Sequence, residues 1–364
     1  VLNDNVRFYG DENNKIEING PLTFVNNTNQ SVQFNNKEGS DHFDGLYLNN
    51  QNLDYILDNV SFRNTGFHNS SMSLTIQGNS EFISCDTIQS DNGDVIISNS
   101  EFISCDIINC TNGSQLINNS QFLSSTQITS DGGNLTILNS EFTDCNLIKF
   151  YNEEVIISNN SFGKTGIYLE NHSGDSESEV LINNNFFSNT DEPSVTAIEL
   201  YGYPNFNLHD NSISSGYING IVLSYCGIGS LEYQKVWNNF ISGCAVAGIH
   251  NYSSNLIIQN NHIYNNMYGI RLHGTSSLAL RGNPNAYFNT QTQEIHDNFC
   301  YEVYAAKNSF PAVFNYNVIQ DEDNMGNPTD PIIYHATESA TPDITHNIAH
   351  NCWGTNFSSE SDLF

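Results

Sequence analysis

The sequence predicts an all-β protein, a parallel β-helix in which short strands wind into stacked coils. The first observation is a 20-residue period: asparagine recurs at this spacing, and phenylalanine follows each asparagine by three residues. The second is that short β-branched runs such as Val95-Ile96-Ile97 precede the asparagines, and these runs are too short for helices. The two columns are Asn79, Asn99, Asn119, Asn139 and Asn159, and Phe82, Phe102, Phe122, Phe142 and Phe162.

A second strand signal follows in the later half of the chain, where Gly or Ala precedes an isoleucine-containing run, as in Gly220-Ile-Val-Leu and Gly269-Ile-Arg-Leu. Strands this short without regular hairpin turns fit a solenoid, in which each coil bonds to its neighbours about 4.8 Å away. Equivalent residues then stack. We therefore expect phenylalanine and isoleucine ladders in the core, asparagine amides stacked at inward turns, and roughly 14 to 16 coils.

The domain organisation predicted from the sequence is simple. Residues 1–50 are expected to form an irregular opening section, and residues 51–354 the β-helix. Residues 275–340 lose the period and contain several prolines, which indicates a long excursion from the coils. Residues 355–364 form a polar tail.

The stretch Asn260-Asn-His-Ile-Tyr-Asn-Asn-Met-Tyr-Gly-Ile-Arg-Leu resembles the parallel β-helix repeat of the pectin-lyase-like superfamily. Asn351-Cys-Trp-Gly is similar to the closing coil of secreted bacterial and archaeal β-helix proteins. The resemblance covers about residues 50 to 354 and implies a right-handed parallel β-helix. It does not select a function, because the superfamily includes lyases, hydrolases, epimerases, adhesins and inert surface proteins.

Charge excludes some partners. The 40 acidic and 10 basic side chains give a net charge of −30, which argues against nucleic acid and against anionic lipid. No apolar run is long enough to span a membrane, so we expect no membrane insertion. A chain starting at Val1 rather than Met, with eight cysteines, fits a mature secreted protein. We expect an extracellular or cell-surface location.

Two outward columns on the later strands hold the chemistry-bearing residues. Alternate residues of a strand point outward, and successive coils align them. The first predicted column is Tyr168, Glu199, Val222, His250 and Arg271, and the second is Glu170, Tyr201, Ser224, Tyr252 and His273.

This face has the side chains that a polysaccharide site needs. Glu199 or Glu170 is a candidate acid or base, His250 or His273 a proton carrier, and Arg271 a clamp for a carboxylate or sulfate. Glu170 and Glu199 in neighbouring coils are candidates for a glycosidase carboxyl pair. The aromatic rings of Tyr168, Tyr201 and Tyr252 are candidate sugar-stacking groups. A solvated polar face without activity is the alternative. No site is expected on the blander coils of residues 73–150.

Family signatures of catalysis are incomplete. Tyr201-Gly-Tyr-Pro is similar to part of an alginate-epimerase motif, but its acidic and histidine positions are not matched, since Asn205 follows Pro204. The paired-aspartate signature of polygalacturonases is not evident. The resemblance therefore transfers no catalytic residue.

Calcium is the one cofactor that the sequence suggests. Asp321-Glu-Asp-Asn-Met-Gly-Asn has two acids and the glycine of a calcium loop, so Asp321 and Asp323 are candidate Ca²⁺ ligands. Met325 at a ligand position weakens the match, and a solvated acidic loop is the alternative. The 11 histidines show no Cys/His zinc spacing.

The cysteines leave two interpretations open. Cys85 and Cys105 stack in adjacent coils, at a separation that permits a disulfide, but a buried cysteine ladder fits equally. Cys226 with Cys244 is a second candidate pair, and Cys300 with Cys352 a third.

Three functions are consistent with these observations. The first is an extracellular structural, adhesive or surface-layer protein that self-assembles into a homo-oligomer or filament. The second is a polysaccharide-active lyase, hydrolase or epimerase with its groove on the later coils. The third is a non-catalytic module that binds a polysaccharide or cell-surface glycan.

Overall fold

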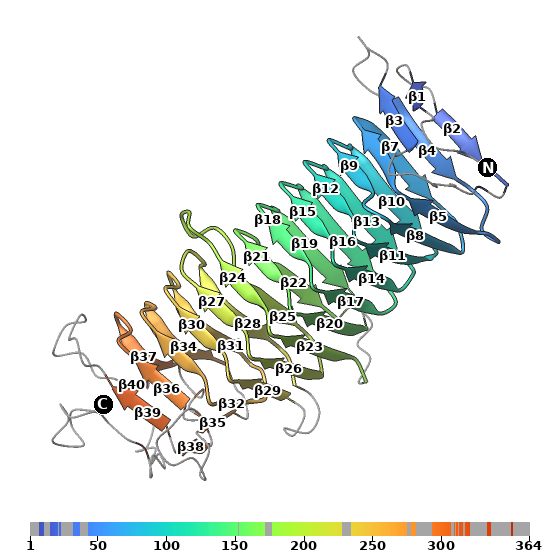
Figure 1. The fold of residues 1–364 in the computed structure, drawn as a ribbon. Coiled ribbons are helices and arrows are strands. Elements are labelled where there is room, and N and C mark those ends of the chain that lie inside the picture. Colours follow the sequence, from blue (N-terminus) through green and yellow to red (C-terminus); the bar gives the residue numbers. More distant parts are fainter. Residues whose placement is uncertain are drawn as a thin grey trace. The chain divides into compact units, whose positions relative to one another are not determined.

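The structure is a computed structural model of the 364-residue chain. It describes residues 7–10, 15–20, 22, 32–36, 43–151, 153–171, 177–227, 234–274, 278–281, 293–306, 309, 311, 313–315, 317–320, 333–335 and 351. Every regular element among these residues is a short β-strand, and the strands pair in parallel with the strands of neighbouring coils (Figure 1). The chain divides into two compact units, Val1–Thr165 and Gly166–Phe364, which we describe separately.

Unit 1 (Val1–Thr165) has three parallel sheets, in which each coil contributes one strand to each sheet. Sheet 1 consists of β1 (Arg7–Gly10), β3 (Val32–Asn36), β6 (Val60–Arg63), β9 (Glu81–Ile83), β12 (Glu101–Ile103), β15 (Gln121–Leu123), β18 (Glu141–Thr143) and β21 (Ser161–Gly163). Sheet 2 consists of β2 (Lys15–Ile18), β4 (Phe43–Leu48), β7 (Thr65–Asn69), β10 (Thr87–Asp91), β13 (Ile107–Thr111), β16 (Gln127–Asp131) and β19 (Leu147–Tyr151). Sheet 3 consists of β5 (Asp54–Asp58), β8 (Ser73–Gln77), β11 (Asp94–Ser98), β14 (Gln115–Asn118), β17 (Leu135–Leu138) and β20 (Glu154–Ser158).

The strands of unit 2 (Gly166–Phe364) follow the same plan and also fall into three parallel sheets. Its sheet 1 consists of β24 (Phe186–Ser188), β27 (Ser212–Ser214), β30 (Phe240–Ser242), β33 (His262–Tyr264), β36 (Gln293–His296) and β39 (Asn317–Gln320). Sheet 2 consists of β22 (Ile167–Glu170), β25 (Ile198–Tyr201), β28 (Asn219–Ser224), β31 (Ala247–Tyr252), β34 (Tyr268–His273), β37 (Tyr301–Ala305) and β40 (Ile333–His335). Sheet 3 consists of β23 (Glu179–Asn183), β26 (Asn205–His209), β29 (Gln234–Trp237), β32 (Leu256–Gln259), β35 (Leu278–Arg281) and β38 (Val313–Asn315).

The predicted phenylalanine ladder forms the core of unit 1. Phe102 and Phe122 stack with ring centroids 4.7 Å apart and planes 3° from parallel, and neighbouring coils repeat the contact. These rings are fully buried. The parallel register places identical residues one above another, so each coil supplies one ring to a continuous apolar column. In unit 2 isoleucine takes this place, for example Ile213, Ile241 and Ile263.

The asparagine column does not point inward, which corrects the prediction. Asn79, Asn99, Asn119, Asn139 and Asn159 are exposed corner residues with φ between 49° and 62°. Asparagine tolerates this left-handed conformation better than most residues, which explains its recurrence. Some of these exposed side-chain amides still form hydrogen bonds between coils. For example, Asn119 Nδ2 donates to Asn99 Oδ1 at 3.2 Å.

The inward ladder lies one residue later. In unit 1 it consists largely of serine, such as Ser100 and Ser120, which are buried. In unit 2 it consists of asparagine: Asn211 Nδ2 donates to Asn239 Oδ1 at 3.0 Å, and Asn239 Nδ2 donates to Asn261 Oδ1 at 2.9 Å. The ladder therefore supplies the hydrogen bonds that buried corner groups need.

The stacked cysteines of unit 1 form a buried ladder. Cys85, Cys105 and Cys145 are buried thiols, and Cys105 Sγ donates to the carbonyl of Phe82 at 3.4 Å. Cys226 and Cys244 are likewise free thiols. Burial raises the pKa of Cys244 to about 12, so this thiol is protonated at neutral pH. Cys352, the partner considered for Cys300, lies outside the described residues.

Strands also occur where the sequence shows no period. Residues 1–50 include β1 to β4, and β1 pairs with β3 as β2 pairs with β4. Residues 275–340 include β35 to β40, which extend the sheets of unit 2. Longer connections separate these strands, so their residues align in space without recurring at a fixed sequence interval.

Candidate functional site

Sheet 2 of unit 2 aligns the predicted outward residues in the predicted register. Tyr168 pairs with Glu199, Glu199 with Val222, Val222 with His250, and His250 with Arg271. The second column aligns in the same way, from Glu170 through Tyr201, Ser224 and Tyr252 to His273. The structure adds Tyr304, which pairs with Arg271, and Tyr334, which pairs with Tyr304.

Aromatic rings surround Arg271 on this surface. The guanidinium carbon lies 5.3 Å from the centroid of Tyr268 and 5.7 Å from that of Tyr304, within cation–π range. Tyr304 and Tyr334 stack at 5.4 Å with planes 13° apart. Tyr301 stacks on Tyr334 at 5.1 Å. We call these five residues, together with His250, Tyr252 and His273, the Tyr–Arg face.

The histidines continue the aromatic surface. The His250 ring centroid lies 4.3 Å from that of Tyr252 and 5.2 Å from that of His273. His273 and Tyr252 stack at 5.2 Å. His273 also lies 5.8 Å from Tyr304, which joins the two halves of the face. Tyr252 and Tyr334 are 40% and 39% exposed, so rings of this face are open to a ligand.

His250 is neutral at physiological pH. Burial lowers its pKa to about 3, and the charges of Arg271 and His273 add to this effect. Burial likewise lowers the pKa of His273. An uncharged His250 can donate one hydrogen bond and accept another, but it does not contribute a positive charge.

Three buried nitrogens on this face lack hydrogen-bond partners among the described residues: His250 Nε2, His273 Nε2 and Arg271 Nε. Buried polar atoms without partners are uncommon because each one costs free energy. All three belong to Arg271 or to the two histidines beside it. The nitrogens that could bond to a ligand are therefore next to the aromatic rings.

The two predicted carboxyl groups lie away from this cluster. Glu199 is separated from His250 by the coil that carries Val222. Glu170 Oε2 accepts a hydrogen bond of 2.8 Å from Tyr168 Oη on its own strand. Glu170 and Glu199 are on paired strands, but Glu199 faces Tyr168 and Glu170 faces Tyr201. The acids therefore mark one end of the columns, and the histidines and arginine mark the other.

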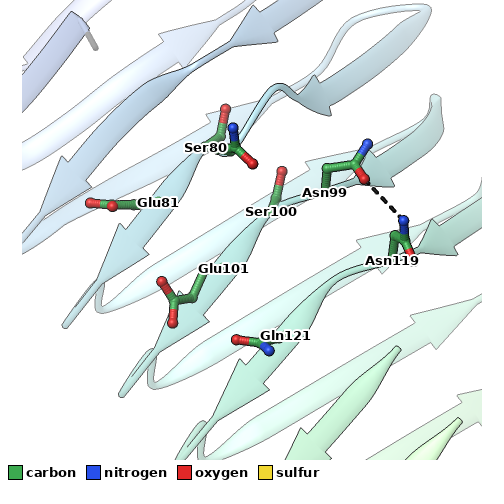
Figure 2. Close-up of a pocket in the computed structure, with 8 residues that line it drawn as sticks. Ser80, Glu81, Asn99, Ser100, Glu101, Asn119 and Gln121 are labelled. Carbon is green, nitrogen blue, oxygen red and sulfur yellow. Dashed lines mark hydrogen bonds between the residues drawn. The ribbon is translucent and has the colours of Figure 1, made fainter. Parts of the chain in front are cut away.

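Unit 1 has a polar depression of about 300 Å³ beside the corner residues Asn79, Asn99 and Asn119 (Figure 2). Glu81, Glu101 and Gln121 line it from paired strands, and Asn99 bonds to Asn119 at its rim. Ligand sites are mostly apolar with a few convergent polar groups, whereas this surface is polar throughout. It is a consequence of repeating the same polar corner.

Two sets of candidate metal ligands lie outside the Tyr–Arg face. Asp321 and Asp323, the candidate Ca²⁺ ligands, lie outside the described residues. Sequence reasoning missed a group of three metal-competent side chains on sheet 1 of unit 2: His262, Glu294 and His296. Ile263 and Ile295 are core residues, so strand alternation places the neighbouring His262, Glu294 and His296 on the outer surface. No regular sequence interval shows that the two strands are paired.

Within the described part of the chain, no helix has the length and hydropathy that a membrane span requires.

Comparisons with known proteins identify the fold. Residues 147–292, which include most strands of the outward columns, match the family model described as "Right handed beta helix region". Searches of curated proteins and of solved structures found no match. The family match is consistent with the resemblance to the pectin-lyase-like superfamily. Together with the parallel sheets of both units, it shows that the chain is a right-handed parallel β-helix protein.

Proposed function

We propose that this protein is an extracellular or cell-surface adhesin that binds a glycan on the Tyr–Arg face without turning it over. The observation that carries the proposal is Arg271 between Tyr268 and Tyr304, in a surface of further tyrosine and histidine rings. Sugar rings present C–H groups that pack on aromatic faces, and their hydroxyls accept hydrogen bonds from a guanidinium. Both kinds of contact are available on this one surface.

The charge of the chain favours a neutral glycan. A net charge of −30 repels a polyanion, and Arg271 is the one cation placed in the two outward columns. Tyr268 and Tyr304 also hold this guanidinium by cation–π contacts. Arg271 is therefore suited to orient a sugar ring by hydrogen bonds while the tyrosines supply contact area.

The arrangement supports binding more than turnover. An acid–base mechanism requires a proton donor and an acceptor near the same bond. His250 is uncharged at neutral pH, and the coil of Val222 separates it from Glu199. The alternative is an enzyme that acts on a polysaccharide as a lyase, hydrolase or epimerase. Its candidate catalytic residues are Glu170, Glu199, His250, Arg271 and His273. Self-assembly into an oligomer or filament, and Ca²⁺ binding, stay predictions.

The test is affinity electrophoresis and calorimetry of the full chain against neutral, uronic-acid and sulfated polysaccharides, with and without Ca²⁺. We expect binding to a neutral glycan, and a loss of about tenfold or more in affinity for Tyr304→Ala and for Tyr252→Ala. Phe186→Ala is the matched control, because Phe186 is an exposed ring of unit 2 on sheet 1. This control should bind like wild type.

Two binding results would reject the proposal, and so would evidence of turnover. One is no binding to any glycan of the panel. The other is an equal loss for Tyr304→Ala and Phe186→Ala, because that would place the contact elsewhere. Unsaturated products seen by ultraviolet absorbance, or new reducing ends, would establish the enzymatic alternative. In that case Glu199→Gln should abolish turnover while binding persists.

A further inference from the structure

We propose that His262, Glu294 and His296 on sheet 1 of unit 2 form a Zn²⁺ site. The residues lie on two paired strands, β33 and β36, with His262 opposite Glu294 and Tyr264 opposite His296. One ligand atom from each of the three side chains can be chosen so that all lie within 4.8 Å of one another. All three are half-buried, so the site is reachable from solvent.

The hydrogen bond of His296 prepares its other nitrogen for a metal. Nδ1 lies 2.7 Å from Oδ2 of Asp297, and a carboxylate oxygen accepts, so Nδ1 carries the proton. Nε2 is then unprotonated, so its lone pair can accept a hydrogen bond or bind a metal ion. A carboxylate bonded to the remote nitrogen of a metal-binding histidine is a recurring arrangement, which fixes the ring and raises its basicity. Asp297 is thus a positioning residue for the site.

The second histidine directs a nitrogen to the same point. Nε2 of His262 lies 2.6 Å from Nε2 of His296. At this distance the two nitrogens share one proton in a hydrogen bond. Two nitrogen ligands at about 2.0–2.1 Å from a tetrahedral Zn²⁺ lie about 3.3 Å apart, so the ion would replace this proton, which is released to solvent, and the rings would separate by about 0.7 Å.

Glu294 completes a three-residue ligand set. It lies on the strand that also carries His296, and one of its carboxylate oxygens lies within 4.8 Å of a ligand nitrogen from each histidine. Two histidines and one glutamate with a remaining open position is a known ligand set for Zn²⁺. Imidazole nitrogen also favours Zn²⁺ over Ca²⁺ and Mg²⁺, which prefer all-oxygen sites.

Aromatic neighbours hold the rings in place. Tyr264 stacks on His296 with centroids 5.3 Å apart and planes 5° from parallel. Phe240 contacts His262 edge to face at 5.0 Å. A binding site gains affinity when its ligands are fixed before the ion arrives.

The chain contains an internal control. His209 Nδ1 bonds to Asp210 Oδ2 at 2.7 Å, as His296 bonds to Asp297. His209 stacks on Trp237 instead of facing a second histidine. Among the described residues, His262, Glu294 and His296 are the only group with metal-ligand geometry. A histidine–aspartate pair alone should therefore not bind Zn²⁺.

The test is titration of the full chain with Zn²⁺ by calorimetry, and with Co²⁺ by visible absorption, in excess Mg²⁺ to occupy the many exposed carboxylates. We expect one Zn²⁺ per chain and a Co²⁺ spectrum of nitrogen coordination. His262→Ala and His296→Ala should each weaken Zn²⁺ binding by about 100-fold or more, and Asp297→Asn by about 10- to 100-fold. His209→Ala should leave it unchanged.

Circular dichroism of each variant establishes that it is folded, and Glu294→Gln and Asp297→Asn keep the test valid if an alanine variant unfolds. Absence of a stoichiometric Zn²⁺ site in wild type would overturn the proposal. So would unchanged affinity in folded His296→Ala, or a loss in His209→Ala equal to that in His296→Ala. Glycan binding by the Tyr–Arg face should not differ between these variants and wild type, so the two proposals fail independently.

Discussion

Asn239 Oδ1 accepts a hydrogen bond of 3.0 Å from the side-chain amide of Asn211, one coil earlier. The same oxygen accepts the backbone N–H of Asn211 at 3.1 Å. Asn239 Nδ2 in turn donates to the carbonyl of Leu208 at 2.9 Å and to Asn261. One buried side chain thus satisfies the corner groups of three successive coils of unit 2.

Replacing Asn239 by leucine should strongly destabilise unit 2. The substitution leaves the backbone N–H of Asn211 and the carbonyl of Leu208 without these partners, and each buried orphan costs about 1–3 kcal/mol. We expect the free energy of unfolding to fall by about 3 kcal/mol or more, measured by urea denaturation. Gln259→Ala, a half-exposed change on a nearby strand, should stay within about 0.5 kcal/mol. Equal effects of the two changes would contradict the role of the ladder.

Two glycines of unit 1, Gly113 and Gly163, should differ sharply in their tolerance of alanine. A Cβ on Gly113 would lie 2.1 Å from the carbonyl oxygen of Gly93, whereas on Gly163 its nearest neighbour is Oγ1 of Thr143 at 3.3 Å. Gly113→Ala must therefore push two coils apart. We expect it to lower the free energy of unfolding by more than about 1 kcal/mol, and Gly163→Ala to change it by less than about 0.5 kcal/mol. Thermal and urea unfolding of the pair measure this, and similar stability of both variants would refute it.

His250 should make the protein less stable as pH falls from neutral. Its pKa in the folded protein is about 3, below the value of about 6.5 in an unfolded chain, so the unfolded state takes up the proton first. The stabilisation is complete above about pH 6.5 and declines toward pH 3, by about 1.4 kcal/mol per pH unit. Burial is the main cause of the lowered pKa of His250, and the positive charges of Arg271 and His273 lower it further.

The matched variant is His250→Val, because valine already occupies this column at Val222. Between about pH 7 and about pH 5 the free energy of unfolding of wild type should fall by about 2 kcal/mol more than that of the variant. Other titrating groups are common to both proteins and cancel in the difference. Parallel pH curves would contradict the prediction, because they would show that folding does not lower the pKa of His250.

The sequence was most informative where coils have constant length. The period of 20 residues predicted the phenylalanine ladder, and strand alternation predicted the register of both columns of sheet 2. The outward placement was wrong for Val222 and His250, which are only 7% and 5% exposed. The same period misplaced the asparagines. Recurrence at Asn99 and Asn119 reflects a left-handed corner, and the inward position is the next residue, Ser100 or Ser120.

The remaining contacts of the candidate sites could not be predicted, because the coils of unit 2 differ in length. Arg271 pairs with Tyr304 and His262 contacts His296, but these partners are separated by connections of irregular length. No fixed interval relates them, so periodicity does not bring them together. Strand alternation also did not predict the burial of His250, which lowers its pKa, because the prediction placed its column in solvent.

The constant coils of unit 1 have an evolutionary consequence. Each coil from Asn79 to Asn159 bonds only to the coil before and the coil after it, and all present the same phenylalanine and corner residues. Loss or duplication of one whole repeat would therefore restore every contact between the new neighbours, so the length of this segment can change in a single genetic step. Unit 2 lacks this freedom. Its inward asparagines are separated by 26, 28 and 22 residues, and no two of its coils are interchangeable.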